Sequence, residues 1–368
     1  MSLVVQMTGT RSVAVAEEED PPLGPHQVRL ETWFSGISAG TELTTYRGSN
    51  PYLNKMWDPD RRFFVDGGPT IDYPMSGWGY EEVGQVVAVG AEVASPAVGD
   101  VVYGTWGHRS HAVVPVSAVA GHVLPTDVAA VHGIFVRVGA IALNAVLAAN
   151  IHLREHLAVF GQGVIGLLAT RMATLSGATV TAVDTLPTRL ALATTMGAKD
   201  IVSASHPGGA AAAIRTLASG GADVAIELSG NYRALHEAIR SVRPNGRVVA
   251  AGFYQGEGIG LRLGEEFHLN QVELVSSQIG SVPSALKARW DRDRLERVFV
   301  ELLADHTLDL SPLVSHVFDV ADVADAFTLL DERPAEALQV VLRFPAARSQ
   351  GMEPRGMESR GMPRGVAS

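Results

Sequence analysis

Residues 156–184 read HLAVFGQGVIGLLATRMATLSGATVTAVD, and this segment determines the architecture that we expect. It opens with a short apolar run, His156–Phe160, which is typical of a buried strand. The motif Gly161-Gln-Gly-Val-Ile-Gly166 follows, then helical periodicity over Val164–Ser176 and a second apolar run, Thr179–Asp184. This order of strand, glycine turn, helix and strand predicts the first unit of a Rossmann dinucleotide-binding domain.

The residues of the motif have separate roles in cofactor binding. Gly161 permits a tight turn, Gly163 lets the backbone approach the pyrophosphate, and Gly166 lets the helix lie close to the strand. Val164 and Ile165 open the helix, whose free N–H groups and positive dipole end attract phosphates. We therefore expect all five residues to hold a dinucleotide, although the glycines would also suit a turn that binds nothing.

Asp184 ends the second strand, where a carboxylate accepts hydrogen bonds from the adenine ribose hydroxyls. The same carboxylate repels a 2′-phosphate, and the next residues, Thr185 and Leu186, supply no cation to bind one. The sequence therefore favours NAD over NADP. Arg189 is expected either to pack on the adenine or to pair with Asp184.

Alternating strands and helices continue beyond this unit and predict a parallel sheet with right-handed crossovers. The segments that we expect are a helix at Pro187–Met196, strands at Ala222–Leu228, Gly246–Gly252 and Val272–Ile279, and a helix at Ala234–Val242. Ser229, Gly252 and Phe253 lie at the ends of two of these strands, so we assign them to the cofactor site as well.

The first third of the chain has short strand patterns bounded by glycine, at Gln27–Thr32, Val83–Val89 and Val98–Tyr103. Such spacing predicts a barrel-like or partly open β domain. A long polar segment, Ser49–Pro74, interrupts it, and a loop of that length is either functional or a surface excursion. Near the other end, Val314–Leu342 returns to a strand, helix, strand pattern that we expect to rejoin the β domain.

These patterns predict three parts. Residues 1–124, completed by 283–345, form the β-rich domain, and residues 125–282 form the dinucleotide-binding domain. The tail 346–368 contains short Gly-Met repeats and few apolar residues, so we expect it to be disordered.

The composition limits the function. The chain has 368 residues, 46% of them hydrophobic, no cysteine and a net charge of −10. Without cysteine there is neither a disulfide nor a thiolate zinc ligand. The negative charge disfavours nucleic-acid binding. No long uninterrupted apolar run or basic leader is present, so we expect a cytoplasmic protein without a membrane partner.

Three motifs carry a family resemblance. GYEEVGQVVAVG at 79–90, VGDVV at 98–102 and GISAGTE at 36–42 resemble segments of the medium-chain dehydrogenase/reductase superfamily, whose zinc-type alcohol dehydrogenases share this order of domains. The resemblance covers about residues 1–345. It implies an α/β fold, with a doubly wound parallel Rossmann sheet beside a β-rich GroES-like catalytic domain. It also implies hydride transfer between NAD(P)(H) and an alcohol, aldehyde, ketone or activated alkene. The GISAGTE segment is most similar to the branch that includes bacteriochlorophyllide dehydrogenase.

The resemblance also marks where this chain departs from the zinc-binding members. Their ligand positions fall here on Ser38 or Ala39, on Tyr80 and on Val136. Only Glu81 keeps the pattern, and a single carboxylate does not make a zinc site. We therefore expect an enzyme that holds no metal.

Without a metal, other groups must stabilise the negative charge that develops on the substrate oxygen. Tyr80 occupies a former ligand position and is the first candidate for the catalytic group. The alternative is that its ring only fills the volume left by the metal. Thr41 matches the family's substrate-binding hydroxyl, and His132 is a third candidate or a core residue. Glu42 and Glu81 either orient these groups or are buried structural acids. His108 and His111 flank a glycine turn and are expected at strand ends or on the surface.

The sequence thus predicts an NAD(H)-dependent, zinc-independent oxidoreductase acting on a secondary alcohol or ketone, with its active site between the domains. Tyr46 and segment 50–64 are expected to form the substrate wall, and the aromatic residues of that segment favour a bulky or cyclic small molecule as the substrate. A homodimer is expected through the edge of the strand Val272–Ile279. Two alternatives stay open: an NAD(P)H-dependent reductase of a polarised C=C bond, against which Asp184 argues, and a dinucleotide-binding protein without catalytic activity.

Overall fold

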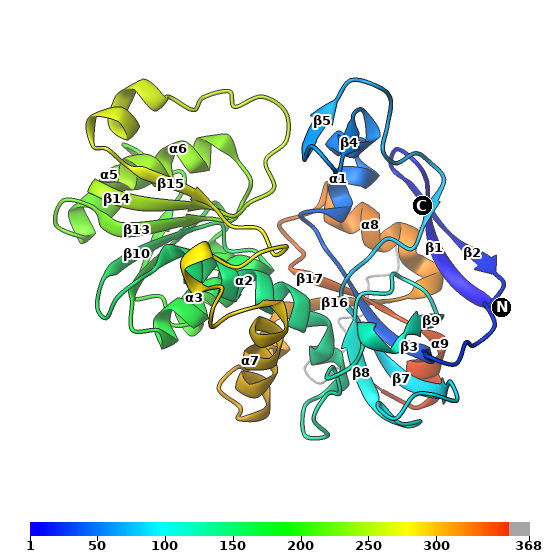
Figure 1. The fold of residues 1–368 in the computed structure, drawn as a ribbon. Helices are drawn as coiled ribbons and strands as arrows, with labels where there is room; N and C mark the ends of the chain where they lie inside the picture. Colours follow the sequence, from blue (N-terminus) through cyan, green and yellow to red (C-terminus); the bar gives the residue numbers. More distant parts are fainter. Residues whose placement is uncertain (353–368) are drawn as a thin grey trace, which may run out of the picture.

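The structure, a computed structural model, describes residues 1–352 in two halves, each built on a six-stranded sheet (Figure 1). The sheet of the first half is entirely parallel, in the order β12-β11-β10-β13-β14-β15. Its strands are β10 (His156–Phe160), β11 (Thr179–Asp184), β12 (Asp200–Ser203), β13 (Ala222–Glu227), β14 (Val242–Ala250) and β15 (Glu273–Ser276). Numbered from β10, this is the order 3-2-1-4-5-6 of a Rossmann fold, which confirms the predicted fold class.

Helices cover both faces of this sheet. One face carries α2 (Phe135–Ala149), α3 (Val164–Leu175) and α4 (Pro187–Thr195), and the other carries α5 (Ala210–Leu217) and α6 (Tyr232–Ser241). The interior is apolar on both sides because the parallel strands are buried on both faces. β10 pairs in parallel with both β11 and β13, so the carboxyl ends of these strands, which carry Phe160, Asp184 and Glu227, lie together at one edge of the sheet.

The second half is β-rich. Its larger sheet runs β16-β17-β3-β7-β8, with β9 also paired to β3, and a smaller sheet runs β2-β1-β6. The bounds are β1 (Ser2–Gly9), β2 (Ser12–Glu18), β3 (Gln27–Ile37), β6 (Met75–Ser76), β7 (Glu82–Val89), β8 (Val101–Gly104), β9 (His111–Pro115), β16 (Val314–Asp319) and β17 (Gln339–Arg343). β17 pairs antiparallel with β3, so the chain returns to this half after leaving the Rossmann sheet.

Three short helices, α1 (Glu42–Tyr46), α8 (Val323–Glu332) and α9 (Pro345–Ser349), belong to the β-rich half. α9 corrects the predicted tail. Residues 346–349 are helical rather than disordered, and Ala347 is fully buried. The rest of the predicted tail, from residue 353, lies outside the described residues. A further helix, α7 (Arg292–Ala304), falls in the segment assigned to the β-rich domain but packs against α2 of the Rossmann half.

The helical segment Ala130–Ala149, which contains α2, was not anticipated from the sequence. By length and composition it is apolar enough to cross a membrane, yet most of it is buried inside the protein. It packs on α3 and α7 and joins the core that both halves share. This burial is typical of a core helix.

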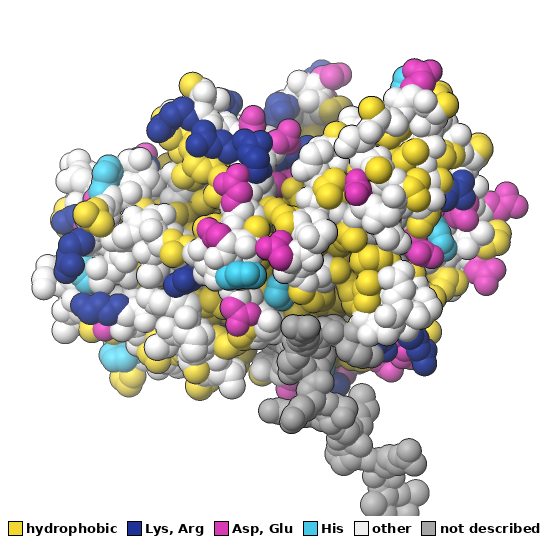
Figure 2. Space-filling model, turned by 90° about the horizontal axis from the view of Figure 1, so that it is seen from below, with side chains coloured by type: hydrophobic (Ala, Val, Ile, Leu, Met, Phe, Trp, Pro, Cys, Tyr) yellow, Lys and Arg dark blue, Asp and Glu magenta, His cyan; other side chains and the backbone are white. Residues whose placement is uncertain are grey.

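On the face seen from below, acidic and histidine side chains gather near the middle, with apolar side chains exposed around them (Figure 2).

The segment 49–74 is a structured excursion rather than an irregular loop. It contains a small hairpin, β4 (Met56–Asp58) and β5 (Phe63–Val65), which lies next to α1 (Figure 1). Both ends of the excursion are fixed to α1. The buried Asn50 amide donates to the hydroxyls of Thr44 and Thr45, at 2.9 and 3.1 Å, and the Tyr73 hydroxyl donates to the Thr45 carbonyl. The hairpin is therefore held beside α1.

Candidate active site

The glycine turn between β10 and α3 has the geometry that phosphate binding requires. Gly161 has a φ of +87°, a left-handed conformation that favours glycine. A Cβ on Gly166 would lie 1.8 Å from the Gly161 carbonyl oxygen, whereas a Cβ on Gly163 would meet no atom within 4 Å. The turn thus packs tightly at Gly166 and leaves open space at Gly163. α3 begins at Val164, so the first N–H groups of the helix, Ile165 included, lack partners within the helix.

Asp184 lies at the carboxyl end of β11 beside this turn and is 7% exposed. Its carboxylate accepts the Gln162 N–H at 2.6 Å through one oxygen and the Leu186 N–H at 2.9 Å through the other. Each carboxylate oxygen has a further lone pair, so the group is still able to accept ribose hydroxyls. The two backbone bonds fix the carboxylate next to the glycine turn.

Arg189 does not pair with Asp184 as one of the sequence interpretations had it. Its Nη2 atom donates to the carbonyl oxygens of Pro334 and Ala337, at 3.0 and 3.1 Å. Those residues precede β17 of the β-rich half, so Arg189 joins α4 to the other half. Its adenine contact remains a prediction.

The ends of β13 and β14 bring Ser229 and Gly252 to the same edge of the sheet as Gly161. A Cβ on Gly161 would lie 2.9 Å from the Ser229 nitrogen, and one on Gly252 would lie 2.3 Å from the Gly230 nitrogen. Phe253 follows and is 41% exposed. These contacts place the predicted residues around one edge, and their binding of a cofactor remains a prediction.

A buried acid at this edge, Glu227, was missed by the sequence analysis. Its carboxylate accepts the N–H groups of Ser229 and Gly230 at 2.7 and 3.1 Å, and the hydroxyl of Tyr254. Burial raises the pKa of Glu227, and these hydrogen bonds oppose that rise. Its position as the last residue of a buried strand was the only available signal.

Three hydroxyl groups meet in the β-rich half where α1 begins. The Tyr80 hydroxyl hydrogen-bonds to Ser38 Oγ and lies 3.4 Å from Thr41 Oγ1. Ser38 is 6% exposed, whereas Tyr80 and Thr41 are partly exposed. The structure thus brings together the two predicted hydroxyls. Ser38, which the sequence analysis considered only as a former metal position, completes the group.

Tyr80 keeps its proton in this setting. Burial, and then the neighbouring Glu81 carboxylate, raise the pKa of the phenol above its ordinary value, while the hydrogen bonds with Ser38 and Thr41 oppose the rise. A phenol with a raised pKa acts as a hydrogen-bond donor to an oxygen that gains negative charge.

Behind the hydroxyls lies a buried ionisable network that contains Glu42, Glu82 and His108, each 0% exposed. Glu42 accepts the Ser38 N–H at 2.9 Å and meets His108 Nε2 at 2.7 Å. The other ring nitrogen, Nδ1, lies 2.5 Å from Ser35 Oγ, which donates to Glu82 at 3.1 Å. The prediction of His108 at a strand end or on the surface is therefore wrong.

Glu81 is 1% exposed, and its Oε2 atom has no hydrogen-bond partner. Burial, and then the carboxylates of Glu42 and Glu82, raise the pKa of Glu81 well above its ordinary value. A Cβ on Gly36 would lie 2.4 Å from this oxygen, so the glycine leaves room for the acid. Glu81 is thus one of the buried acids that the sequence analysis considered.

The raised pKa of Glu81 gives a pH prediction. The folded state binds this proton more tightly than the unfolded state, so the stabilisation is complete below pH 4.5, the ordinary value, and is lost as the pH rises through the folded-state pKa. Glu81→Gln is expected to melt at a higher temperature than the parent at pH 8 and to show a weaker fall in Tm between pH 5 and pH 8. Thermal unfolding across this range checks it; parallel Tm curves for the two proteins would contradict it.

His132 stands apart from the hydroxyl group. Its ring packs edge-on against Phe135 at a centroid distance of 6.5 Å, and burial lowers its pKa, while Asp309 opposes that change. Among residues 1–352, no hydrogen bond joins His132 to Tyr80 or Thr41. Tyr46, which was expected to form part of the substrate wall, is instead buried in the core, where its ring packs against Phe327.

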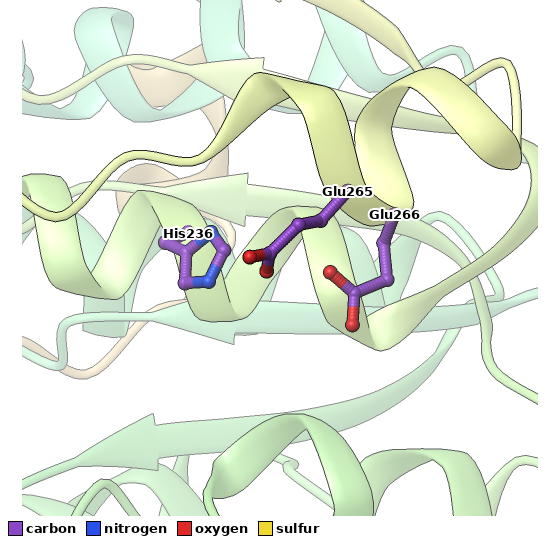
Figure 3. Close-up of side chains that lie close together, drawn as sticks. All are labelled: His236, Glu265 and Glu266. Atoms are coloured by element: carbon purple, nitrogen blue, oxygen red, sulfur yellow. The ribbon is translucent and has the colours of Figure 1, made fainter.

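The side chains at the former ligand positions do not fit a zinc ion. Ala39 has no donor atom, Val136 is 0% exposed within α2, and the phenol of Tyr80 stays protonated. The described residues contain one group of His, Asp or Glu side chains spaced for a metal, formed by His236, Glu265 and Glu266 (Figure 3). That group lies on α6 and on a helical turn, Leu263–Phe267, between β14 and β15, and Arg240 is bonded to Glu266 at 3.1 Å. It is not part of the hydroxyl site.

Known dehydrogenases are similar to this chain in sequence. A family model described as zinc-binding dehydrogenase matches residues 164–294. D-guloside 3-dehydrogenase of Escherichia coli is 28% identical over 349 residues, which cover 92% of this chain and 98% of that protein. (R,R)-butanediol dehydrogenase of Bacillus subtilis is 27% identical over 288 residues, covering 71% and 78%. These matches support a place for the chain in the medium-chain dehydrogenase/reductase superfamily.

The dehydrogenase shares its fold with solved structures. A zinc-binding dehydrogenase from Sinorhizobium meliloti, bound to NADP, superposes with a TM-score of 0.74 at 21% identity, covering 93% of this chain and 99% of that one. The chain is thus an NAD(P)-dependent alcohol dehydrogenase or ketone reductase of the medium-chain type. At the positions where the family resemblance places zinc ligands, this chain has Ser38 or Ala39, Tyr80 and Val136.

Proposed function

We propose that the dehydrogenase transfers hydride between NAD(H) and a secondary alcohol or ketone without a metal ion. The observation that carries this proposal is the group of three hydroxyls, in which Tyr80 and Ser38 stand at expected zinc-ligand positions and Thr41 stands at that of the substrate-binding hydroxyl. Preorganised donors aimed at a developing oxyanion contribute a large part of many rate accelerations. Three hydroxyls therefore supply polarisation that a Lewis acid would otherwise provide.

The choice of NAD rests on Asp184. Its carboxylate is fixed beside the glycine turn by two backbone N–H groups. A 2′-phosphate at this position would meet a buried negative charge, whereas the free 2′-hydroxyl of NAD would donate to it. Arg189 does not offset the charge, because its guanidinium is bonded to two carbonyl oxygens of the other half.

A residue of this chain supplies the proton that the substrate oxygen takes up when the ketone is reduced. The bound nicotinamide supplies or accepts the hydride. In the reductive direction, the Tyr80 phenol donates a hydrogen bond and then its proton to the substrate oxygen; the Ser38 hydroxyl stabilises the resulting phenolate by a hydrogen bond, and solvent returns a proton to the partly exposed phenol. Because the phenol pKa is raised, the proton transfer is completed only as the oxygen approaches an alkoxide. Thr41 holds the same oxygen through its hydroxyl.

The substrate that we propose is a secondary alcohol on a polyol or sugar ring. Two relatives are named for oxidising such alcohols, a D-guloside and a butanediol. In this chain the excursion 49–74 next to α1 carries Tyr52, Trp57 and Phe64, and the Phe64 ring packs edge-to-face with the other two at centroid distances of 5.0–5.2 Å. Rigid aromatic side chains of this kind offer apolar surface to the face of a sugar ring.

A direct assay tests the proposal. Purified protein is given glycosides and acyclic secondary alcohols with NAD⁺ or NADP⁺, and ketones and enones with NADH or NADPH. We expect turnover of secondary alcohols or ketones with a kcat/KM at least about 10-fold higher for NAD(H) than for NADP(H). Turnover confined to enones with NADPH, or tight NADH binding without any turnover, would replace the proposal with one of its two rivals.

A further inference from the structure

A histidine joins the two segments that supply the paired hydroxyls. Tyr80 lies just before β7, and Ser38 lies just after β3, so the two come from separate strands. The His108 ring lies behind both. It is 0% exposed and belongs to neither segment, because it comes from the loop between β8 and β9.

On the Ser38 side, the link runs through one carboxylate. Glu42 binds the Ser38 N–H with one oxygen, at 2.9 Å, and His108 Nε2 with the other, at 2.7 Å. A carboxylate held at both oxygens cannot rotate without breaking a buried hydrogen bond, and leaving a buried polar group unpaired is unfavourable. His108 therefore fixes the turn from Ser38 to Glu42.

On the Tyr80 side, the link is a close approach of backbone and ring. The His108 N–H donates to the Trp78 carbonyl at 2.9 Å. Gly79, whose φ is +113°, leaves the space that the ring fills, since a Cβ there would lie 2.8 Å from His108 Cε1. The residue before Tyr80 is thus shaped around the imidazole.

The carboxylates around the His108 ring favour its protonated form. Burial lowers the pKa of His108, but the Glu42 carboxylate, its hydrogen bond and Glu82 raise it by more, so the pKa lies above the ordinary value. Because the ring is fully enclosed, it has no path to hand a proton to a substrate. Its effect on the reaction must pass through the groups that it holds.

We propose that His108 is a positioning residue for hydride transfer, holding Ser38 through Glu42 and Tyr80 through residues 78 and 79 so that the two hydroxyls meet at the substrate oxygen. This rests on the proposed function, because it takes those hydroxyls as the reacting groups. A misplacement of about 1 Å in such a pair costs about 100-fold in rate.

The test compares His108→Leu, which removes both ring hydrogen bonds, with His108→Gln, which keeps a donor for Glu42. His111→Leu is the matched control, because it is a partly exposed histidine three residues away whose ring lies 3.6 Å from Glu31. We expect His108→Leu to lower kcat by about 10- to 100-fold, with KM and the NADH Kd within about 2-fold of the parent, and His108→Gln to recover most of the loss. His111→Leu should match the parent.

Two further measurements keep the outcomes distinct. If His108→Leu does not fold, Glu42→Gln replaces it, because that change weakens the same link and keeps the side chain's shape; the expected loss of kcat is the same. The inference is overturned if the folded variants keep the parent kcat, or if only KM changes. If Tyr80→Phe keeps full activity, the proposed function fails instead, whatever His108 does.

Discussion

Gly163→Val is expected to fold like the parent protein and to bind NADH about 100-fold more weakly. A Cβ at residue 163 would meet no atom within 4 Å in the protein, so the first atom of the new side chain has open space. The side chain occupies the open space over the first turn of α3, where the pyrophosphate must approach the backbone. Fluorescence titration with NADH and thermal unfolding measure the two effects separately.

Gly166→Ala is the matched control for this prediction. Its Cβ would lie 1.8 Å from the Gly161 carbonyl, so the change must displace the helix and lower the Tm. A glycine in a turn that binds nothing would give a different pattern: Gly163→Val would leave NADH affinity unchanged. That result would contradict the assignment of the cofactor site to this glycine turn.

Tyr80→Phe is expected to lower kcat by about 100- to 1000-fold, because it removes the donor aimed at the substrate oxygen. The NADH Kd should stay the same, since Tyr80 belongs to the β-rich half and the phosphate-binding turn to the other. The ring and its packing remain, so the Tm should change little. Steady-state kinetics in both directions provide the measurement.

Ser38→Ala is the companion variant. It takes away the hydroxyl that bonds to Tyr80 while keeping the phenol, so its kcat should fall less than that of Tyr80→Phe. The double variant should lose little more than Tyr80→Phe alone, as expected for groups that act together. Additive losses, or a Tyr80→Phe enzyme with the parent kcat, would show that the phenol only fills space.

Much of the Rossmann half could be predicted because its signals are local. The glycine turn, the apolar runs and the capping proline at residue 187 lie within a few residues of the structures that they specify, and β10 and β11 have the predicted bounds. α2 was not predicted, because its residues are buried almost all round the helix and leave little amphipathic pattern in the sequence. The helix α9 escaped because it is short and its composition matches the tail that follows.

The hydroxyl site could be predicted only where a motif marked it. Tyr80 and Thr41 stood at recognisable positions, but the partnership with Ser38 depends on how β3 and β7 end in space. His108 and Glu227 depend on long-range contacts: His108 lies 66 residues from its carboxylate partner. Arg189 likewise found carbonyl partners in a segment 145 or more residues away. No local pattern encodes such contacts.

The most direct test of the account is the zinc content of the active enzyme, measured together with its response to a strong chelator. We expect a zinc content far below one ion per chain and full NAD-dependent turnover after chelation, because in the proposed site hydroxyls rather than metal ligands polarise the substrate oxygen. About one zinc per chain, with activity lost on chelation and restored by added zinc, would contradict the central claim.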